Sequence, residues 1–469
     1  MKKRKYLNSG DKIYFMNKSY SEKLNSLIPG GAHTYSRGDD QYPSNAPAIL
    51  ESGKGAYVWS PDGRKFLDYG MALRAVTLGY ANERVNNAAI REINKGVNLT
   101  RASTIELEAA QTMVDLIPGA DMVKFAKNGS NVTSAAVKIA RSYTGRKYVC
   151  VPRQQPFFSF DDWFIGVTKM NKGIPFEHHS TTLVFDYNDI SSLEELFLEY
   201  KDQIAAVILE PATTLNPCQN LNCSSVCDLT KTCGVCPNNN NNFLKLVQNL
   251  CKKEGTLFII DEMITGFRWH LQGAQTYFGI EPDLSTFGKG MANGFSVAAL
   301  VGKKEIMDAG SINKLGSERT FLISTTHGGE MSGMGALIET ISIYKEQEVI
   351  KHLWEYGKKM FDGINKISKQ LGLLDYFYMD GGYVSMNYVT KNKNGEISMA
   401  FRTLFAQEMI NNGVLIPWIA PSFSHGDLEL NITLEAVEKS LRIYKMALEN
   451  EISQFLIGPE IKPVFRKFN

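Results

Sequence analysis

The sequence has no excess of charge of one sign and no long hydrophobic run. Its 469 residues carry 51 Lys and Arg against 49 Asp and Glu, so no strong basic field is available to attract nucleic acid or anionic lipid. Nowhere do about 18 apolar residues follow one another, and the basic first residues continue into polar ones rather than into the apolar core of a signal peptide. These absences favour a cytoplasmic protein with small-molecule partners, and they argue against nucleic-acid and membrane binding.

Cysteine is scarce outside one short segment. Of the seven cysteines, five lie in the stretch CQNLNCSSVCDLTKTCGVC, namely Cys218, Cys223, Cys227, Cys233 and Cys236. A secreted disulfide scaffold normally spreads its cysteines, so this pattern favours a reducing compartment. Only the last two cysteines have the C-x2-C spacing of a zinc site, and the spacing does not support an iron–sulfur cluster. A structural zinc and a metal-free insertion at about residues 216–242 therefore both stay open.

The chain is longer than one hydrophobic core usually serves, so we expect more than one domain. Residues 47–70 alternate apolar and polar side chains around two Gly-containing turn signals, which predicts a small antiparallel hairpin unit within an N-terminal segment, 1–75. Helical patterns then alternate with short apolar runs, and we assign 76–330 to a large α/β domain with a mostly parallel sheet. Residues 331–469 predict a smaller α+β C-terminal domain.

Polar residues follow the predicted strand MVKFAK. Asn128, Gly129, Ser130 and Asn131 come next and run directly into a helical pattern. In open parallel sheets, ligands bind at the carboxyl ends of the strands. Small residues at a helix start present free N–H groups and a hydroxyl to an anion such as phosphate. An ordinary N-cap has the same signature, so this segment alone does not identify a phosphate site.

A carboxylate and a lysine follow two other predicted strands. Asp261 ends the apolar run TLFII, where a carboxylate is costly unless a cation or a hydrogen-bond donor meets it. Lys289 follows the strand-like DLSTF, so the two residues should end adjacent or nearby strands at the same rim of the sheet. A buried salt bridge is one interpretation. The flanking Gly288 and Gly290 instead favour a group that approaches the backbone closely.

A phosphate held by a helix start, a ring nitrogen held by a carboxylate and an aldehyde condensed with a lysine are together what pyridoxal phosphate requires. The segments FIIDEMITGFR and PDLSTFGKGMANGFSVAALVG resemble the cofactor signature of the class III aminotransferases, in the subgroup that includes glutamate-1-semialdehyde 2,1-aminomutase. Supporting matches are IPGG, GAYVWSPDGRKFLDYG, VKFAKNGSNVTSAAVKIAR and VILEP. The resemblance covers residues from about 27 to 330 and implies a pyridoxal-phosphate-dependent transferase of fold type I.

The resemblance also implies roles for individual residues. Lys289 would condense with the cofactor aldehyde and then move a proton, while Asp261 would hold the ring nitrogen. Glu210 matches a pocket glutamate to which we assign no specific role. The remaining cofactor contacts would come from Gly129, Ser130 and Asn131 at the phosphate, from Met263 and Phe157 on the two faces of the ring, and from Thr326. The family's equivalent of this threonine reaches the phosphate of the neighbouring subunit, so a homodimer with a shared active site is implied.

One segment departs from the family pattern. Where members commonly have Tyr-His-Gly, this chain reads CVPRQQPFFSFDDWF, with Phe157 as the expected stacking ring and Phe158 in place of the histidine. Packing of both rings in the core is the alternative interpretation.

Substrate recognition rests on the stretch IPGGAHTYSRGDD. Arg37 falls at the position of an arginine that binds the substrate carboxylate in the aminomutase. Asp39 and Asp40 follow it, and they would either pair with Arg37 or favour hydroxyl-bearing and amine-bearing substrates over an amino-dicarboxylate skeleton. We therefore expect an aminotransferase that moves an amino group from an amino acid donor such as glutamate to a keto or aldehyde acceptor, such as a sugar derivative. Glutamate-1-semialdehyde 2,1-aminomutase is the alternative, and a non-catalytic fold relative is a more distant one.

Overall fold

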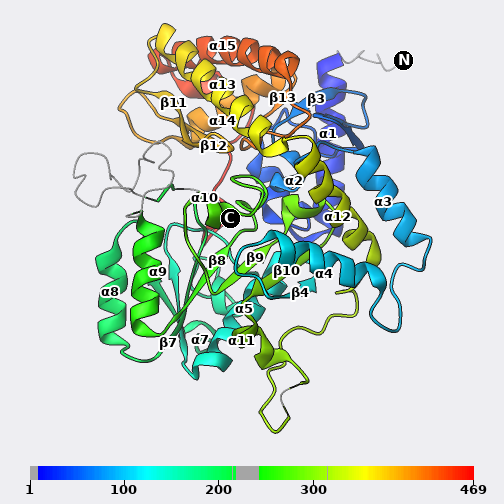
Figure 1. Cartoon of the computed structure of the whole chain (residues 1–469). Helices are drawn as coiled ribbons and strands as arrows, with labels where there is room; N and C mark the ends of the chain where they lie inside the picture. Colours follow the sequence, from blue (N-terminus) through cyan, green and yellow to red (C-terminus); the bar gives the residue numbers. More distant parts are fainter. Residues whose placement is uncertain (1–8, 214, 218–241, 314) are drawn as a thin grey trace. The chain divides into compact units, whose positions relative to one another are not determined.

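The computed structural model describes residues 9–213, 215–217, 242–313 and 315–469 (Figure 1). Its internal contacts divide the chain into two compact units. One unit comprises Met1–Met71, Gly79–Ala81 and Glu355–Arg466, and the other comprises Ala72–Leu78, Asn82–Trp354 and Lys467–Asn469. The N-terminal segment thus belongs to the same unit as most of the C-terminal region, while residues 331–354 belong to the unit that holds the larger sheet. The clustered cysteines, Cys218 to Cys236, lie outside the described residues.

A seven-stranded sheet forms the centre of the second unit, which we call the sheet unit. Its spatial order is β4-β10-β9-β8-β7-β5-β6. Strand β10 runs antiparallel to both of its neighbours, and every other pairing is parallel, which confirms the mostly parallel α/β fold. The strands are β4 (Met122–Ala126), β5 (Tyr148–Pro152), β6 (Thr182–Phe185), β7 (Ile204–Leu209), β8 (Leu257–Asp261), β9 (Leu284–Phe287) and β10 (Ala298–Gly302).

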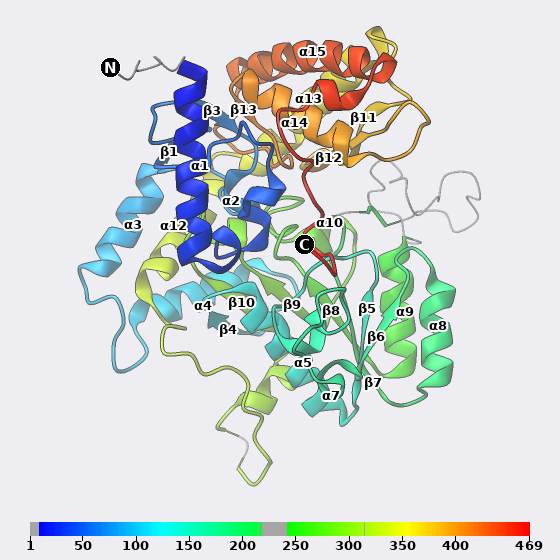
Figure 2. The ribbon, with the colours of Figure 1, turned by 180° about the vertical axis from the view of Figure 1, so that it is seen from behind.

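The central strands are continuously apolar because helices cover the sheet. All residues of β7, with sequence IAAVIL, are buried, as expected for a parallel strand that is covered on both faces. Helix α5 (Gly129–Thr144) packs against five of the strands, and its small buried residues, among them Ala136 and Ala140, allow a close approach. Helices α8 (Ile190–Glu199) and α9 (Phe243–Glu254) lie side by side (Figures 1 and 2) and contact β6 and β8 respectively.

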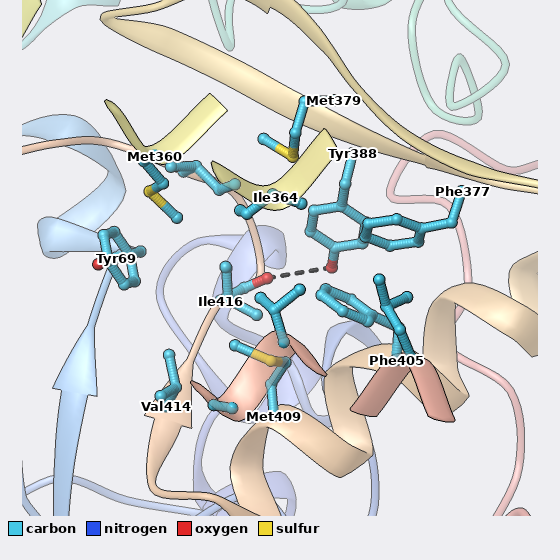
Figure 3. Packing of buried hydrophobic residues seen from close by; sticks show 14 of the residues in the cluster. Tyr69, Met360, Ile364, Phe377, Met379, Tyr388, Phe405, Met409, Val414 and Ile416 are labelled. Atoms are coloured by element: carbon cyan, nitrogen blue, oxygen red, sulfur yellow. Dashed lines mark hydrogen bonds between the residues drawn. The ribbon is translucent and has the colours of Figure 1, made fainter. Parts of the chain in front are cut away.

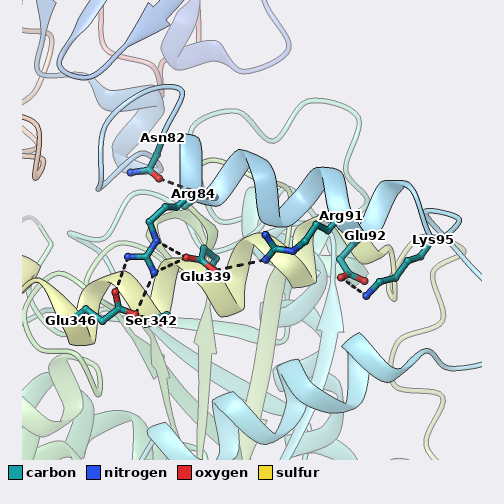
Figure 4. Close-up of polar contacts among 9 residues, drawn as sticks. Asn82, Arg84, Arg91, Glu92, Lys95, Glu339, Ser342 and Glu346 are labelled. Carbon is teal, nitrogen blue, oxygen red and sulfur yellow. Dashed lines mark hydrogen bonds and ion pairs between the residues drawn. The ribbon is translucent and has the colours of Figure 1, made fainter.

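Helix α12 (Met331–Glu346) packs on two other helices of the sheet unit, α3 (Glu83–Ile93) and α4 (Thr104–Leu116). Arg84 of α3 donates hydrogen bonds to the carboxylates of Glu339 and Glu346 on α12, each at 2.7 Å (Figure 4). Ser103 and Glu106 form a reciprocal capping box at the start of α4, which satisfies N–H groups that the helix leaves free. The short helices are α2 (Met71–Arg74), α6 (Asp162–Ile165), α7 (Phe176–His179), α10 (Ala274–Tyr277) and α11 (Lys304–Met307).

The other unit contains two small sheets and four long helices. Strands β1 (Ser52–Lys54), β2 (Tyr57–Trp59) and β3 (Lys65–Asp68) are antiparallel, and β13 (Val414–Leu415) joins β3 in parallel. Strands β11 (Phe377–Gly382) and β12 (Ser385–Thr390) form a separate hairpin. The helices are α1 (Ser9–Leu27), α13 (Val349–Gln370), of which the first residues belong to the sheet unit, α14 (Met399–Asn411) and α15 (Asp427–Glu449).

This unit has its own hydrophobic core (Figure 3). Phe377 stacks on Tyr388 there, and the ring of Phe405 packs at a tilt against both. The Tyr388 hydroxyl donates to the Ile416 carbonyl at 3.0 Å. The buried hydroxyl thus has the partner that a polar group needs in an apolar environment. Within the described ranges, no helix is long and apolar enough to cross a membrane.

Candidate active site

Asp261 and the segment that carries Lys289 end two neighbouring parallel strands. Asp261 is the last residue of β8 and lies opposite Thr286 of β9 in the sheet register. Its Oδ1 accepts hydrogen bonds from the Met263 amide at 2.9 Å and from the Thr286 hydroxyl at 3.1 Å. Lys289 comes two residues after β9, at the start of the short 3-10 helix η4 (Lys289–Ala292). The predicted adjacency of these two strands at one rim of the sheet is therefore confirmed.

The glycines around Lys289 are required by close packing on both sides. A Cβ on Gly288 would lie 2.7 Å from the sulfur of Met263, and a Cβ on Gly290 would lie 2.8 Å from the Thr77 hydroxyl. Lys289 itself has a φ of +42°, a left-handed conformation that costs a non-glycine residue about 1–3 kcal/mol. The Tyr344 hydroxyl of α12 donates to the Gly290 carbonyl at 2.6 Å. These contacts hold the lysine-bearing loop in one strained conformation.

The Lys289 amine lies among opposite charges in a poorly solvated place. Burial lowers the pKa of Lys289, while the negative charges of Glu210 and Asp261 oppose that shift. Burial also raises the pKa of both carboxyl groups. A lysine with a lowered pKa spends more time as the neutral amine, which is the nucleophilic form and the form that can accept a proton.

Glu210 directly follows β7 and is only 4% exposed. Gln155 fixes its backbone from the segment after β5, because the Gln155 side chain accepts from the Glu210 amide at 2.8 Å and donates to the Glu210 carbonyl at 2.6 Å. The Thr213 side chain acts on the Glu210 carboxyl group, but among the described residues no donor lies within hydrogen-bond geometry of its Oε2 atom. A buried carboxylate oxygen without a partner is costly, so this atom fits a site that receives a ligand.

Met263 lies between the start of α5 and the lysine-bearing loop. A Cβ on Gly129 would come within 2.9 Å of its sulfur, much as one on Gly288 would. At the same helix start, the amide of Asn131 donates to the Asn128 side chain at 3.1 Å, and the Ser130 hydroxyl accepts from the Phe160 amide at 3.0 Å. The structure therefore brings the predicted phosphate segment next to the residue predicted for one face of the ring.

The two phenylalanines of the divergent segment have different environments. Phe158 is 2% exposed and packs edge-on against Phe164, with ring centroids 5.3 Å apart. Phe157 meets the same ring edge-on but is 43% exposed. Of the two rings, Phe157 is thus the one with a free surface for stacking, and its role stays a prediction.

Two further predicted site residues, Arg37 and Thr326, are exposed. Arg37 is exposed in a 3-10 helix (Tyr35–Arg37) of the other unit. Among the described residues it makes no ion pair with the acids that follow it, because Asp40 pairs with Arg466 and Asp39 accepts from Ser21 and Asn25. Thr326 is exposed in the sheet unit.

The backbone carbonyl of Thr326 accepts from the Asn98 side chain at 2.9 Å. The expected contact of this threonine with a second subunit stays a prediction.

Two charged residues of the sheet unit have environments that the sequence pattern did not reveal. Glu262, next to Asp261, is fully buried and accepts from the Thr265 hydroxyl and from the Gln275 amide, the latter at 2.8 Å. It therefore fixes a loop. Arg74 is half-buried, and its charge acts on both Glu210 and Lys289. In the sequence, the one indication of a special environment for Arg74 is that it is a lone charged residue in the apolar run MALRAVTL.

The fold and this rim together define an enzyme of the pyridoxal-phosphate-dependent aminotransferase type. The chain belongs to the class-III aminotransferases, because the family model matches residues 39–215 and 229–440. The unmatched residues 216–228 fall within the insertion that the sequence predicts.

Known relatives match the chain over nearly its whole length. It is 29% identical to 3-aminobutyryl-CoA aminotransferase of Cloacimonas acidaminovorans (strain Evry), over 92% of this chain and 97% of the relative. It is 30% identical to glutamate-1-semialdehyde 2,1-aminomutase of Aquifex aeolicus (strain VF5), over 85% of this chain and 92% of the relative. Among solved structures, the PLP-bound FumI protein of Sphingopyxis sp. MTA144 superposes with a TM-score of 0.79 at 25% identity, covering 92% of this chain and 96% of that one.

Proposed function

We propose that this enzyme moves an amino group from an amino acid donor to a separate keto or aldehyde acceptor. The observation that carries the proposal is the Lys289 amine, which lies in a strained loop beside two buried carboxylates, Asp261 and Glu210. Burial lowers the pKa of this amine even though both carboxylates oppose the shift. A plain salt bridge explains neither the close packing that excludes side chains at Gly288 and Gly290 nor the unpartnered oxygen of Glu210.

The residues of the rim fit pyridoxal phosphate. When bound, the cofactor supplies an electron sink for the substrate carbon that carries the amino group. Asp261 would hold the ring nitrogen in its protonated form, and burial would strengthen that attraction. Lys289 would carry the cofactor at its amine and, once released, would move a proton at the substrate carbon.

The remaining predicted contacts complete the cofactor site. Gly129, Ser130 and Asn131 would hold the phosphate at the start of α5, with Met263 and Phe157 on the two faces of the ring. A second subunit would add Thr326 to the phosphate. Each role is a proposal supported by position in the fold.

A sugar derivative is the acceptor that we expected from Asp39 and Asp40. Both acids have partners within their own unit, so they do not require a substrate hydroxyl. We therefore propose a panel of acceptors in which a keto-sugar, an oxo acid and an aldehyde are compared directly.

Intramolecular transfer is the second candidate, and the 30% identity to an aminomutase favours it. An aminomutase needs one substrate and no separate acceptor. Glutamate-1-semialdehyde supplied alone would therefore be converted to 5-aminolevulinate by an aminomutase, and an aminotransferase would leave most of it unchanged.

The first experiment is an absorbance spectrum of the purified enzyme between about 320 and 450 nm, before and after L-glutamate. Our proposal expects a long-wavelength band that moves to shorter wavelength with glutamate and returns when an acceptor is added. A band that responds to no amino acid donor would contradict intermolecular transfer.

The cysteine-rich segment needs a separate measurement. Metal analysis of the purified protein distinguishes the two open interpretations, since a structural zinc gives about one zinc per chain and a metal-free insertion gives none.

A further inference from the structure

Arg74 lies in a backbone segment that is strained over several residues. Ala72, Leu73 and Arg74 have φ values of +48°, +63° and +67°, all in the left-handed region. Each such non-glycine residue costs about 1–3 kcal/mol. Strain of this kind persists only where the surrounding contacts fix the segment, and it is concentrated at binding and catalytic sites.

The contacts that fix the segment come from the lysine-bearing loop. Thr77 lies where a side chain on Gly290 would be, and the Leu78 amide donates to the Asn293 side chain at 2.9 Å. A Cβ on Gly294 would come within 3.1 Å of Val76. Residues 76–78 therefore pack directly on the loop that carries Lys289, and Arg74 precedes them by two residues.

The Arg74 guanidinium has no counter-ion in contact. Its Nε atom is buried without a hydrogen-bond partner, and the described residues offer it no ion pair. Glu210, whose charge attracts it, also has a buried oxygen without a partner. Arginine does not lose its proton in proteins, and a buried donor such as this Nε atom is costly to leave without a partner. An anion that enters the site would remove this cost.

We infer that Arg74 binds the carboxylate group of the amino donor or acceptor, beside Lys289. The planar guanidinium matches a carboxylate through two parallel hydrogen bonds. The inference rests on the proposed function and gives its substrates one common feature, a carboxylate. It also assigns substrate recognition to the unit that carries Lys289, whereas Arg37 belongs to the other unit.

The cofactor phosphate is the other anion to be considered. Its predicted place is the start of α5, whose described contacts are with Met263 and Phe160. The groups on which the charge of Arg74 acts are instead Glu210 and Lys289. These neighbours favour the substrate carboxylate over the phosphate.

The test measures ligand binding to the purified holoenzyme by calorimetry. The probes are two acids, glutarate and butyrate. Glutarate is compared with its diamide and butyrate with butyramide, because these amides have the same carbon chain but no carboxylate. The variants are Arg74→Gln, Arg74→Lys and Arg37→Gln. Arg84→Gln is the matched control because that arginine is ion-paired on the surface of the same unit as Arg74. Affinity for pyridoxal phosphate is measured in parallel, and thermal unfolding checks that each variant is folded.

We expect the wild-type enzyme to bind at least one of the two acids more tightly than the corresponding amide. In Arg74→Gln, the affinity for that acid should fall at least twentyfold. Arg74→Lys should lie between the two because it keeps the charge but not the paired hydrogen bonds. Cofactor affinity should change less than threefold. If Arg74→Gln lost cofactor affinity as strongly as acid affinity, the result would overturn the inference in favour of the phosphate. If Arg37→Gln lost affinity for the acid and Arg74→Gln did not, the result would overturn it in favour of Arg37.

Wild-type enzyme that does not distinguish any acid from its amide would also overturn the inference. Binding of these unreactive acids does not require turnover, so the result is independent of whether L-glutamate changes the absorbance spectrum.

Discussion

Lys289 combines a strained backbone with a lowered pKa. Replacing it with alanine should reduce kcat by at least about a thousandfold, because the chain would lose its nucleophilic amine and its proton carrier. The variant should still bind pyridoxal phosphate through the other contacts, without the long-wavelength band of the lysine-bound form. Steady-state kinetics and an absorbance spectrum check both statements.

Lys303 offers the control for this substitution. It follows β10 in the same unit and pairs with Asp283 at 2.6 Å. Lys303→Ala should keep the spectrum of the wild type. Normal turnover in Lys289→Ala would remove our assignment of the catalytic lysine.

Gly288 tests whether close packing explains the glycines around the lysine. Its φ of −177° is accessible to any residue, so Gly288→Ala probes space alone. The added methyl group would meet the Met263 sulfur at 2.7 Å, and we expect a loss of about 1–3 kcal/mol in unfolding free energy. The double variant with Met263→Ala should recover part of that loss in a double-mutant cycle. If Gly288→Ala lowered the unfolding free energy equally in the wild type and in the Met263→Ala variant, the packing explanation would be contradicted.

Glu262 should make stability depend on pH in a specific direction. Burial raises the pKa of Glu262 to about 7 from its ordinary value of about 4.5, so the folded state holds the proton more tightly than the unfolded state. The contribution to stability is then present at low pH and is lost as the pH rises from about 4.5 to about 7. The stability of the wild type relative to Glu262→Gln should fall across this window by roughly 2–3 kcal/mol.

Thermal unfolding of both proteins at pH 5, 6 and 8 measures that difference. The other buried carboxyl groups are common to both proteins, so the comparison isolates Glu262. A stability difference that is constant with pH would show that the carboxyl group is ionised throughout.

At the scale of elements, the start of α4 depends on a capping box. The Ser103 amide donates to the Glu106 carboxylate at 2.8 Å, and the Ser103 hydroxyl accepts from the Glu106 amide. Ser103→Ala should lower the unfolding free energy by about 1 kcal/mol. Glu108→Ala, a change at an exposed position of the same helix, should alter it by less than about 0.5 kcal/mol. Chemical denaturation measures both, and equal effects would contradict the capping role.

Element identity was well predicted by periodicity, and element direction was not. The short apolar run SVAALVG has the composition of a strand and contains β10, but the antiparallel orientation of β10 between β4 and β9 depends on the path of the chain. Likewise, β13 joins β3 from a distance in sequence of more than 300 residues. Two residues carry too little pattern to predict such a pairing.

At the scale of the whole molecule, we predict a homodimer whose subunits share each active site. Sedimentation should give twice the mass of one chain. Thr326→Ala should weaken cofactor binding several-fold, because one hydroxyl contact to the phosphate would be lost. Ser317→Ala, a nearby change on the same exposed segment, is the control. A monomer with full activity would contradict the shared site.

The sequence by itself determined the parts of this enzyme that depend on local order. The strand-end positions of Asp261 and Lys289, the glycines on either side of the lysine and the small residues that open α5 follow from short motifs, since the ends of parallel strands share one rim. The tertiary structure alone decided the surroundings of Arg74, Glu210 and Glu262. Burial, the partners of a charge and a left-handed turn arise from segments that are distant in the chain, so no local pattern contains them.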